Sequence, residues 1–142
     1  MNPTFQTSIL PLIARLHLAP LFILSGVAKL ADPNGTIAYI ASSGAPLPQL
    51  GYVFALAVEV GGGLLLLLGY RTKYVAGAIA LFSMAAAMLF HSNFADQNQM
   101  VHFLKNVAIA GGLLQVVAFG AGRFSLDGLR GKRAAVGGVA TA

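Results

Sequence analysis

The chain alternates between long apolar stretches and short polar connections. The apolar stretches cover about residues 9–30, 50–70, 74–91 and 101–120. Each is long enough to cross, as a helix, the hydrocarbon core of a bilayer, which is roughly 30 Å thick. A membrane-spanning segment must satisfy its own backbone hydrogen bonds, and an apolar stretch of about 20 residues does so as a helix. The pattern therefore predicts an all-α integral membrane protein, a bundle of four helices in contact with the lipid bilayer.

The composition supports this placement. Hydrophobic residues make up 57% of the 142 residues and charged residues only 9%, whereas soluble domains carry about 25% charged residues. The net charge of +5 is typical of some nucleic-acid-binding proteins. The basic residues, however, lie in the connections and the tail rather than in one patch, so we expect no nucleic-acid partner. Cysteine is absent, which excludes disulfides, thiol chemistry and Cys-ligated clusters.

The sequence divides into one four-span domain, residues 1–127, and a tail, residues 128–142, which is first basic and then flexible. The first apolar stretch lacks the features of a cleavable leader and is expected to be a retained span. The positive-inside rule assigns the most basic connections to the cytoplasm. Both termini and the connection at 70–74 are therefore predicted to be cytoplasmic, because the basic residues there are Arg71, Lys73, Arg123, Arg130, Lys132 and Arg133.

One carboxylate, Glu59, lies near the middle of the second apolar stretch. A charge at that depth costs roughly 2.5–3.5 kcal/mol, so it normally faces the bundle interior and has a partner. Arg15 lies ~9 Å inside the first stretch, and in antiparallel helices its depth differs from that of Glu59 by about 6 Å. Arg15 either extends to the headgroups or turns inward to form a buried charge pair with Glu59. Both interpretations stay open.

A second polar group is expected near the outer membrane surface. Its members are Lys29, His91, His102, Lys105 and Asn106, the last three sharing one helix face. A quinone headgroup needs hydrogen-bond donors to its carbonyls beside an apolar trough, so these five are candidate ligand-binding residues. The alternative is an ordinary wet membrane interface, where such residues are common.

Other kinds of site find little support. His91 and His102 have no obvious third partner besides Asp96, whereas a transition-metal site usually needs three or four ligands, so no metal site is expected. Phosphate loops, nucleophile triads and dinucleotide fingerprints are absent. No cofactor is evident, catalytic residues stay unassigned, and whether the protein is an enzyme stays open.

Several short motifs follow one another in a distinctive order over about residues 10–127. They are Arg15, Phe22–Leu30, Ala45–Pro48, Glu59–Gly63, Leu67–Lys73, Phe103–Asn106 and Ser125–Asp127. Together they resemble the DoxX family of small four-helix bacterial inner-membrane proteins. The resemblance implies the inner membrane, and it marks Arg15, Lys29, Glu59 and Lys105 as functional positions. It also implies links to quinol oxidation, thiosulfate:quinone oxidoreduction or oxidative-stress assemblies, without a cofactor motif.

Three functions remain. The first is a quinone-linked or redox-associated membrane component with a quinone or similar lipophilic ligand and a redox partner protein. The second is a non-catalytic scaffold or partner subunit that packs through small-residue helix faces. The third is a small-molecule transporter with Glu59 as a proton-coupled group. Four spans are few for a transporter, and we expect a homo-oligomer.

Overall fold

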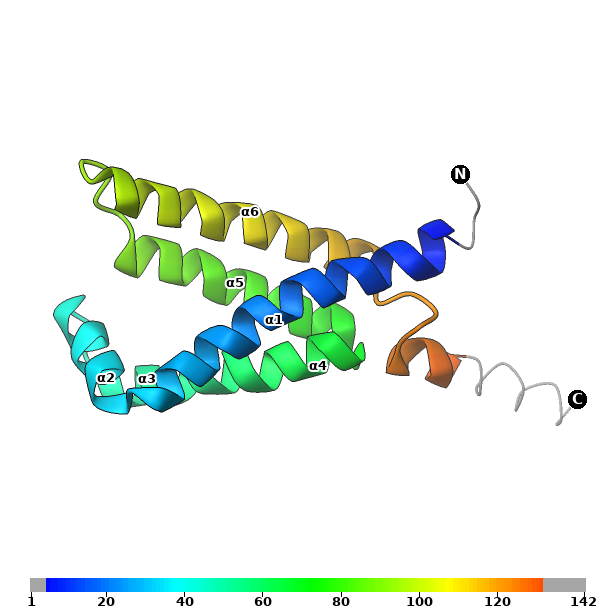
Figure 1. The fold of residues 1–142 in the computed structure, drawn as a ribbon, viewed down its shortest axis with the longest axis horizontal. Helices are drawn as coiled ribbons and strands as arrows, with labels where there is room; N and C mark the ends of the chain where they lie inside the picture. The colour runs from blue at the N-terminus through cyan, green and yellow to red at the C-terminus, as the bar shows by residue number, and fades with distance from the viewer. Residues whose placement is uncertain (1–4, 132–142) are drawn as a thin grey trace, which may run out of the picture.

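The computed structural model describes residues 5–131, and this part of the chain is helical without strands (Figure 1). The predicted flexible end of the tail, residues 134–142, lies outside the described range, as do the basic residues 132 and 133. A last helical turn, 126–131, follows the bundle.

Four long helices form the bundle. The first consists of a π-helical turn, η1 (Phe5–Ile9), and α1 (Leu10–Ala31). The second is continuous from α3 (Pro48–Leu56) through the π-helical η2 (Ala57–Gly62) to α4 (Gly63–Leu68). The third and fourth are α5 (Thr72–Phe90) and α6 (Gln97–Phe119). All four are long and apolar enough to cross a membrane, which confirms the predicted all-α membrane bundle. Which end faces the cytoplasm stays a prediction.

The two ends of the bundle differ. Residues 32–47 and 91–96 lie at one end, here called the loop end (Figure 1). Residues 5–9, 69–71 and 120–131 lie at the other, here called the termini end. The loop end carries a short helix, α2 (Pro33–Ser42). Asp32 caps α2 by accepting a hydrogen bond from the Gly35 N–H, and Pro33 occupies the first helical position, where its missing N–H has no intrahelical partner to lose.

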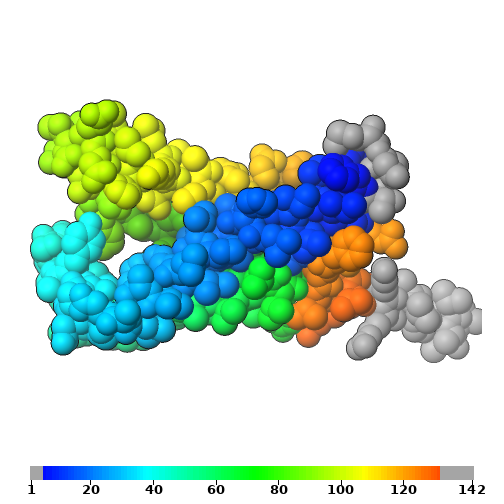
Figure 2. Space-filling view, viewed as in Figure 1, coloured from blue at the N-terminus to red at the C-terminus, as the bar shows by residue number. Residues whose placement is uncertain are grey.

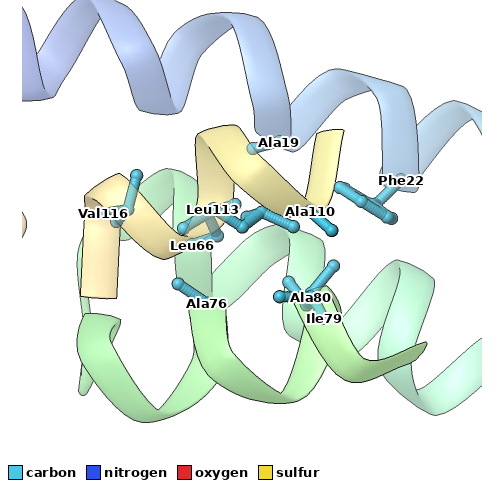
Figure 3. Packing of buried hydrophobic residues seen from close by; sticks show 9 residues of the cluster. All are labelled: Ala19, Phe22, Leu66, Ala76, Ile79, Ala80, Ala110, Leu113 and Val116. Atoms are coloured by element: carbon cyan, nitrogen blue, oxygen red, sulfur yellow. The ribbon is translucent and has the colours of Figure 1, made fainter. Parts of the chain in front are cut away.

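Small side chains dominate the core. Ala76 and Ala80 lie one turn apart on α5 and are both buried, which brings α5 close to its neighbours. The large apolar side chains point mostly outward, as for Leu81 and Phe119, which suits a protein whose solvent is lipid. The core cluster (Figure 3) consists of Ala19, Phe22, Leu66, Ala76, Ile79, Ala80, Ala110, Leu113 and Val116.

The bundle is closed at the termini end and open at the loop end. α5 and α6 stay side by side, but they diverge from α2 and α3 toward the loop end (Figure 1). Figure 2 shows the surface hollowed between the cyan α2 and the yellow-green start of α6. The hollow leads to the cavity described below, because the cavity is lined by residues of α1, α2, α3, α5 and α6.

Candidate functional site

A cavity of about 410 Å³ lies in the loop-end half of the bundle. Its size falls within the roughly 300–1,000 Å³ of most small-molecule sites. Its walls are largely apolar, and its polar side chains include Ser25, Lys29, Glu59, His91 and Asn106. Five aromatic side chains contribute to the walls: Phe22, Tyr39, Phe54, Phe82 and Phe90. The cavity therefore combines a broad aromatic surface with a small number of polar groups.

Glu59 and Lys29 form an ion pair in this cavity. The Lys29 Nζ lies 2.8 Å from the Glu59 Oε1, and the two side chains are 26% and 6% exposed. Lys29 also donates to the Ser25 Oγ at 2.9 Å, one helical turn earlier on α1. The Ser25 hydroxyl in turn donates to the same Glu59 oxygen at 3.2 Å. Glu59 therefore has the partner that a carboxylate inside a membrane bundle requires.

Close backbone packing places this ion pair. A Cβ on Gly26 would lie 2.5 Å from the Val60 Cγ2 and 3.2 Å from the Glu59 Cβ. Glycine at this position therefore lets α1 come directly against η2, so that Ser25 and Lys29 flank the carboxylate. A Cβ on Gly63 would likewise lie 3.3 Å from the backbone nitrogen of Ile23. Glu59 itself lies in a π-helical stretch, a local widening that is frequent at functional sites.

The ion pair has unused hydrogen-bonding capacity. The Glu59 Oε2 is buried and has no hydrogen-bond partner among residues 5–131. The Lys29 ammonium has three protons and uses two of them, on Ser25 and Glu59. Both residues line the cavity, and the carboxylate can accept one further hydrogen bond while the ammonium can donate one.

Three of the five predicted ligand-binding residues meet at this cavity: Lys29, His91 and Asn106. The His102 ring stacks on the His91 ring, with centroids 5.0 Å apart, so it lies behind the lining rather than in it. The His91 Nδ1 is held by the Gln99 Oε1 at 2.7 Å. Lys105 is exposed on α6 and is not part of the lining, although it precedes Asn106 in the chain. Within residues 5–131, His, Asp and Glu side chains nowhere gather in groups of three or more that could hold a metal ion.

The interpretation that pairs Arg15 with Glu59 is wrong, because the structure gives Glu59 a different partner. Arg15 is 1% exposed, as the inward interpretation requires. Its Nη1 donates to the Leu67 carbonyl at 2.6 Å and its Nη2 to the Phe124 carbonyl. Gly26 is the α1 residue level with Glu59, and Arg15 lies eleven residues earlier, ~16 Å away along the helix. That separation is well beyond the depth difference of about 6 Å between Arg15 and Glu59 that residue counting predicts.

At the termini end, the Phe124–Asp127 segment closes the bundle. The Asp127 carboxylate accepts hydrogen bonds from the backbone N–H groups of Arg71 and Thr72, both at 2.8 Å, and from the Thr72 hydroxyl at 2.7 Å. It thus caps the start of α5 from a distant part of the chain. Partial burial opposes ionisation of Asp127, but the hydrogen bonds from Thr72 and Arg71 outweigh burial and hold its pKa below the usual value.

Two further residues take part in these contacts. Ser25 joins the site as a bridge between Lys29 and Glu59, and its i,i+4 spacing from Lys29 places the two on one helix face. Thr72 has no comparable signal, because its partner Asp127 is 55 residues away. The termini end is therefore closed by contacts among the motifs at residues 15, 67–73 and 125–127. The cavity is lined by residues from the motifs at 22–30 and 59–63.

Comparison with known proteins identifies the family of this chain. The DoxX family model matches residues 10–92. The inner membrane protein YqjF of Escherichia coli K12 is 39% identical over 122 residues, which cover 86% of this chain and 92% of YqjF. The inner membrane protein YphA of the same organism is 36% identical over 124 residues, 84% of this chain and 89% of YphA. No solved structure matches the chain significantly. The chain belongs to the DoxX family and is a multi-pass protein of the bacterial inner membrane.

Proposed function

We propose that this protein binds a lipophilic small molecule of the quinone class in the loop-end cavity and acts as a quinone-linked or redox-associated component of the inner membrane. The observation that carries the proposal is the Lys29–Glu59 ion pair, which is buried against aromatic walls and keeps unused hydrogen-bonding capacity.

The walls suit a flat aromatic headgroup. Aromatic side chains stack on ring systems and contribute beyond the area that they bury. Tyr39 and Phe90 already stack on each other, with centroids 5.4 Å apart, where α2 meets α5. The third proton of Lys29, with His91 and Asn106 nearby, supplies donors for the oxygen atoms of such a headgroup.

The cavity also has a route for an apolar tail. Leu21, Phe54 and Leu89 line the cavity, and each is more than half exposed. All three lie on membrane-spanning helices, so a hydrocarbon tail that leaves the cavity between these helices enters lipid and not water. A lipophilic quinone combines a polar ring with such a tail, and this combination matches the two parts of the site.

The first experiment is mass spectrometry of the gently purified protein, recording bound lipophilic molecules and copurified chains together. We expect a quinone in near-stoichiometric amount in the wild type. In the Lys29→Met variant the amount of bound quinone should fall at least about tenfold, because a hydrogen bond from a charged donor is lost. Lys105→Gln is the matched control, because it also removes a lysine but lies outside the cavity; its quinone content should equal that of the wild type.

A second variant blocks the cavity and leaves the ion pair unchanged, so that ligand loss can be tested without removing a charge. Ala86 lines the cavity, and Ala86→Phe should displace the ligand without touching the ion pair. Ala108→Phe, on the exposed face of α6, adds the same ring outside the cavity and should keep the ligand. A wild-type protein that carries a stoichiometric partner chain and no lipophilic molecule would contradict the proposal and favour the scaffold function. Proton-dependent flux that Glu59→Gln abolishes would favour the transporter.

A further inference from the structure

We infer that the cavity selects ligands by a hydroxyl group that donates to the Glu59 Oε2, so that it holds a lipophilic phenol or hydroquinone in preference to the corresponding quinone. This inference rests on the proposed ligand class and adds which chemical form of the ligand the site recognises. It also extends to phenols that have no redox chemistry.

The first step is the distribution of hydrogen bonds on Glu59. An ionised carboxylate accepts hydrogen bonds and donates none. Both donors that reach Glu59, the Lys29 ammonium and the Ser25 hydroxyl, bind the same oxygen, Oε1. The other oxygen, Oε2, is buried without a partner among residues 5–131. This oxygen can accept a further hydrogen bond, so a ligand that supplies a donor gives it a partner.

The second step is that the residues next to the carboxylate cannot supply this donor. Ser25 has one hydroxyl proton, and it is used on Oε1. Gly26, which lies against the Glu59 Cβ, and the neighbouring Val60 have no polar side chain. The Asn106 amide donates to the His102 carbonyl at 3.0 Å. The donor is therefore expected to come from the ligand.

The third step separates the two forms of the ligand. A phenolic hydroxyl donates one hydrogen bond and accepts others, so one group can bind the Glu59 Oε2 and the spare proton of Lys29 together. A quinone carbonyl only accepts, so it can use Lys29 but leaves Oε2 unpaired. The difference is one hydrogen bond to a charged acceptor, equivalent to roughly a 10- to 100-fold difference in affinity. A site that is built to bind a hydroxyl discriminates strongly against analogues that lack it.

The test measures binding to the full-length protein in detergent or nanodiscs by calorimetry, with ligands matched in shape. One pair is a short-chain hydroquinone and its quinone, each held in its redox state. The other is a para-alkylphenol and its methyl ether, which lacks the donor and carries one additional methyl group. We expect the hydroxyl-bearing member of each pair to bind about 10–100 times more tightly.

Two variants locate the preference. In Glu59→Gln the amide has one acceptor oxygen and its own donors, so the preference for the hydroxyl-bearing ligand should fall to within about threefold. In Ser25→Ala the donor to Oε1 is lost while Oε2 is unchanged, so the preference should persist. If Glu59→Gln does not fold, the ligand pairs in the wild type still decide whether the site prefers the hydroxyl-bearing ligand.

The outcomes are distinct. Equal affinity for both members of each pair, or tighter binding of the quinone and the ether, overturns this inference and leaves the proposed quinone-class function standing. Failure of all four ligands to bind overturns both. A preference for the hydroxyl that survives Glu59→Gln overturns the assignment to Oε2.

Discussion

Arg15 and Glu59 are both buried inside the bundle, and the structure uses them in different ways. Both terminal nitrogens of Arg15 donate to backbone carbonyls, at the end of α4 and in the segment that follows α6. Its Nε has no partner among the described residues, but Arg15 is not among the residues that line the cavity. Glu59 holds Lys29 and Ser25 through one oxygen and keeps the other oxygen unpaired in a residue that lines the cavity.

The difference separates a charge that joins backbone segments from a charge that we propose binds a ligand. The guanidinium satisfies carbonyl groups that the end of α4 leaves without helical partners, and it ties them to a distant segment. Such an arrangement has no role for a ligand. The charge of the Glu59 carboxylate is balanced by Lys29, but one of its oxygens has no hydrogen-bond partner among the described residues, and the residue lines an aromatic cavity. Variants at the two sites should therefore separate stability from ligand binding.

The largest effect is expected from Arg15→Met. It removes the donors to the α4 carbonyls and to Phe124, and we expect a loss of about 3 kcal/mol in the free energy of unfolding. Arg15→Lys should recover only part of this loss. The planar guanidinium donates to two carbonyls in different directions, and the compact ammonium of lysine cannot reproduce that geometry. Thermal unfolding in detergent measures both. An unchanged melting temperature, or loss of ligand with stability intact, would contradict the structural role.

A smaller effect is expected from the ion pair. Lys29→Met leaves Glu59 buried and unpaired and should reduce stability by about 2 kcal/mol, less than for a fully buried pair because Lys29 is partly exposed. Lys29→Met combined with Glu59→Leu should recover much of that loss, since no unpaired charge remains. Ligand binding should be lost in the single and the double variant. A double variant that is merely the sum of the two single variants would show that the residues do not interact.

The smallest effect is expected from Asp127→Asn, which removes the charge that caps α5 and should reduce stability by about 1 kcal/mol without changing ligand affinity. Because folding lowers the pKa of Asp127, its contribution is present above the ordinary value of 3.8 and is lost as the pH falls through the lower value of the folded protein. Melting curves of wild type and variant should converge as the pH drops below about 4. A gap that is constant across pH would argue against an ionised cap.

The amino-acid sequence by itself determined the class of the protein. Span length and the exclusion of charge are local properties, so four apolar stretches predicted four membrane helices without knowledge of their packing. The same argument identified Glu59 as a buried group in need of a partner, because a charge in an apolar stretch is costly wherever the helix packs. Of the five candidate ligand-binding residues, Lys29, His91 and Asn106 line the cavity, and their role in binding stays a prediction.

Only the tertiary structure decided which groups meet. Lys29, and not Arg15, reaches Glu59, because Gly26 sets the contact between α1 and η2 at the far half of the first span. Asn106 lines the cavity and Lys105 does not, since adjacent helical residues point about 100° apart. The Asp127 cap joins groups that are 55 residues apart in the chain. These contacts depend on the relative depth, rotation and tilt of whole helices, which many side chains set together and no single stretch of sequence encodes.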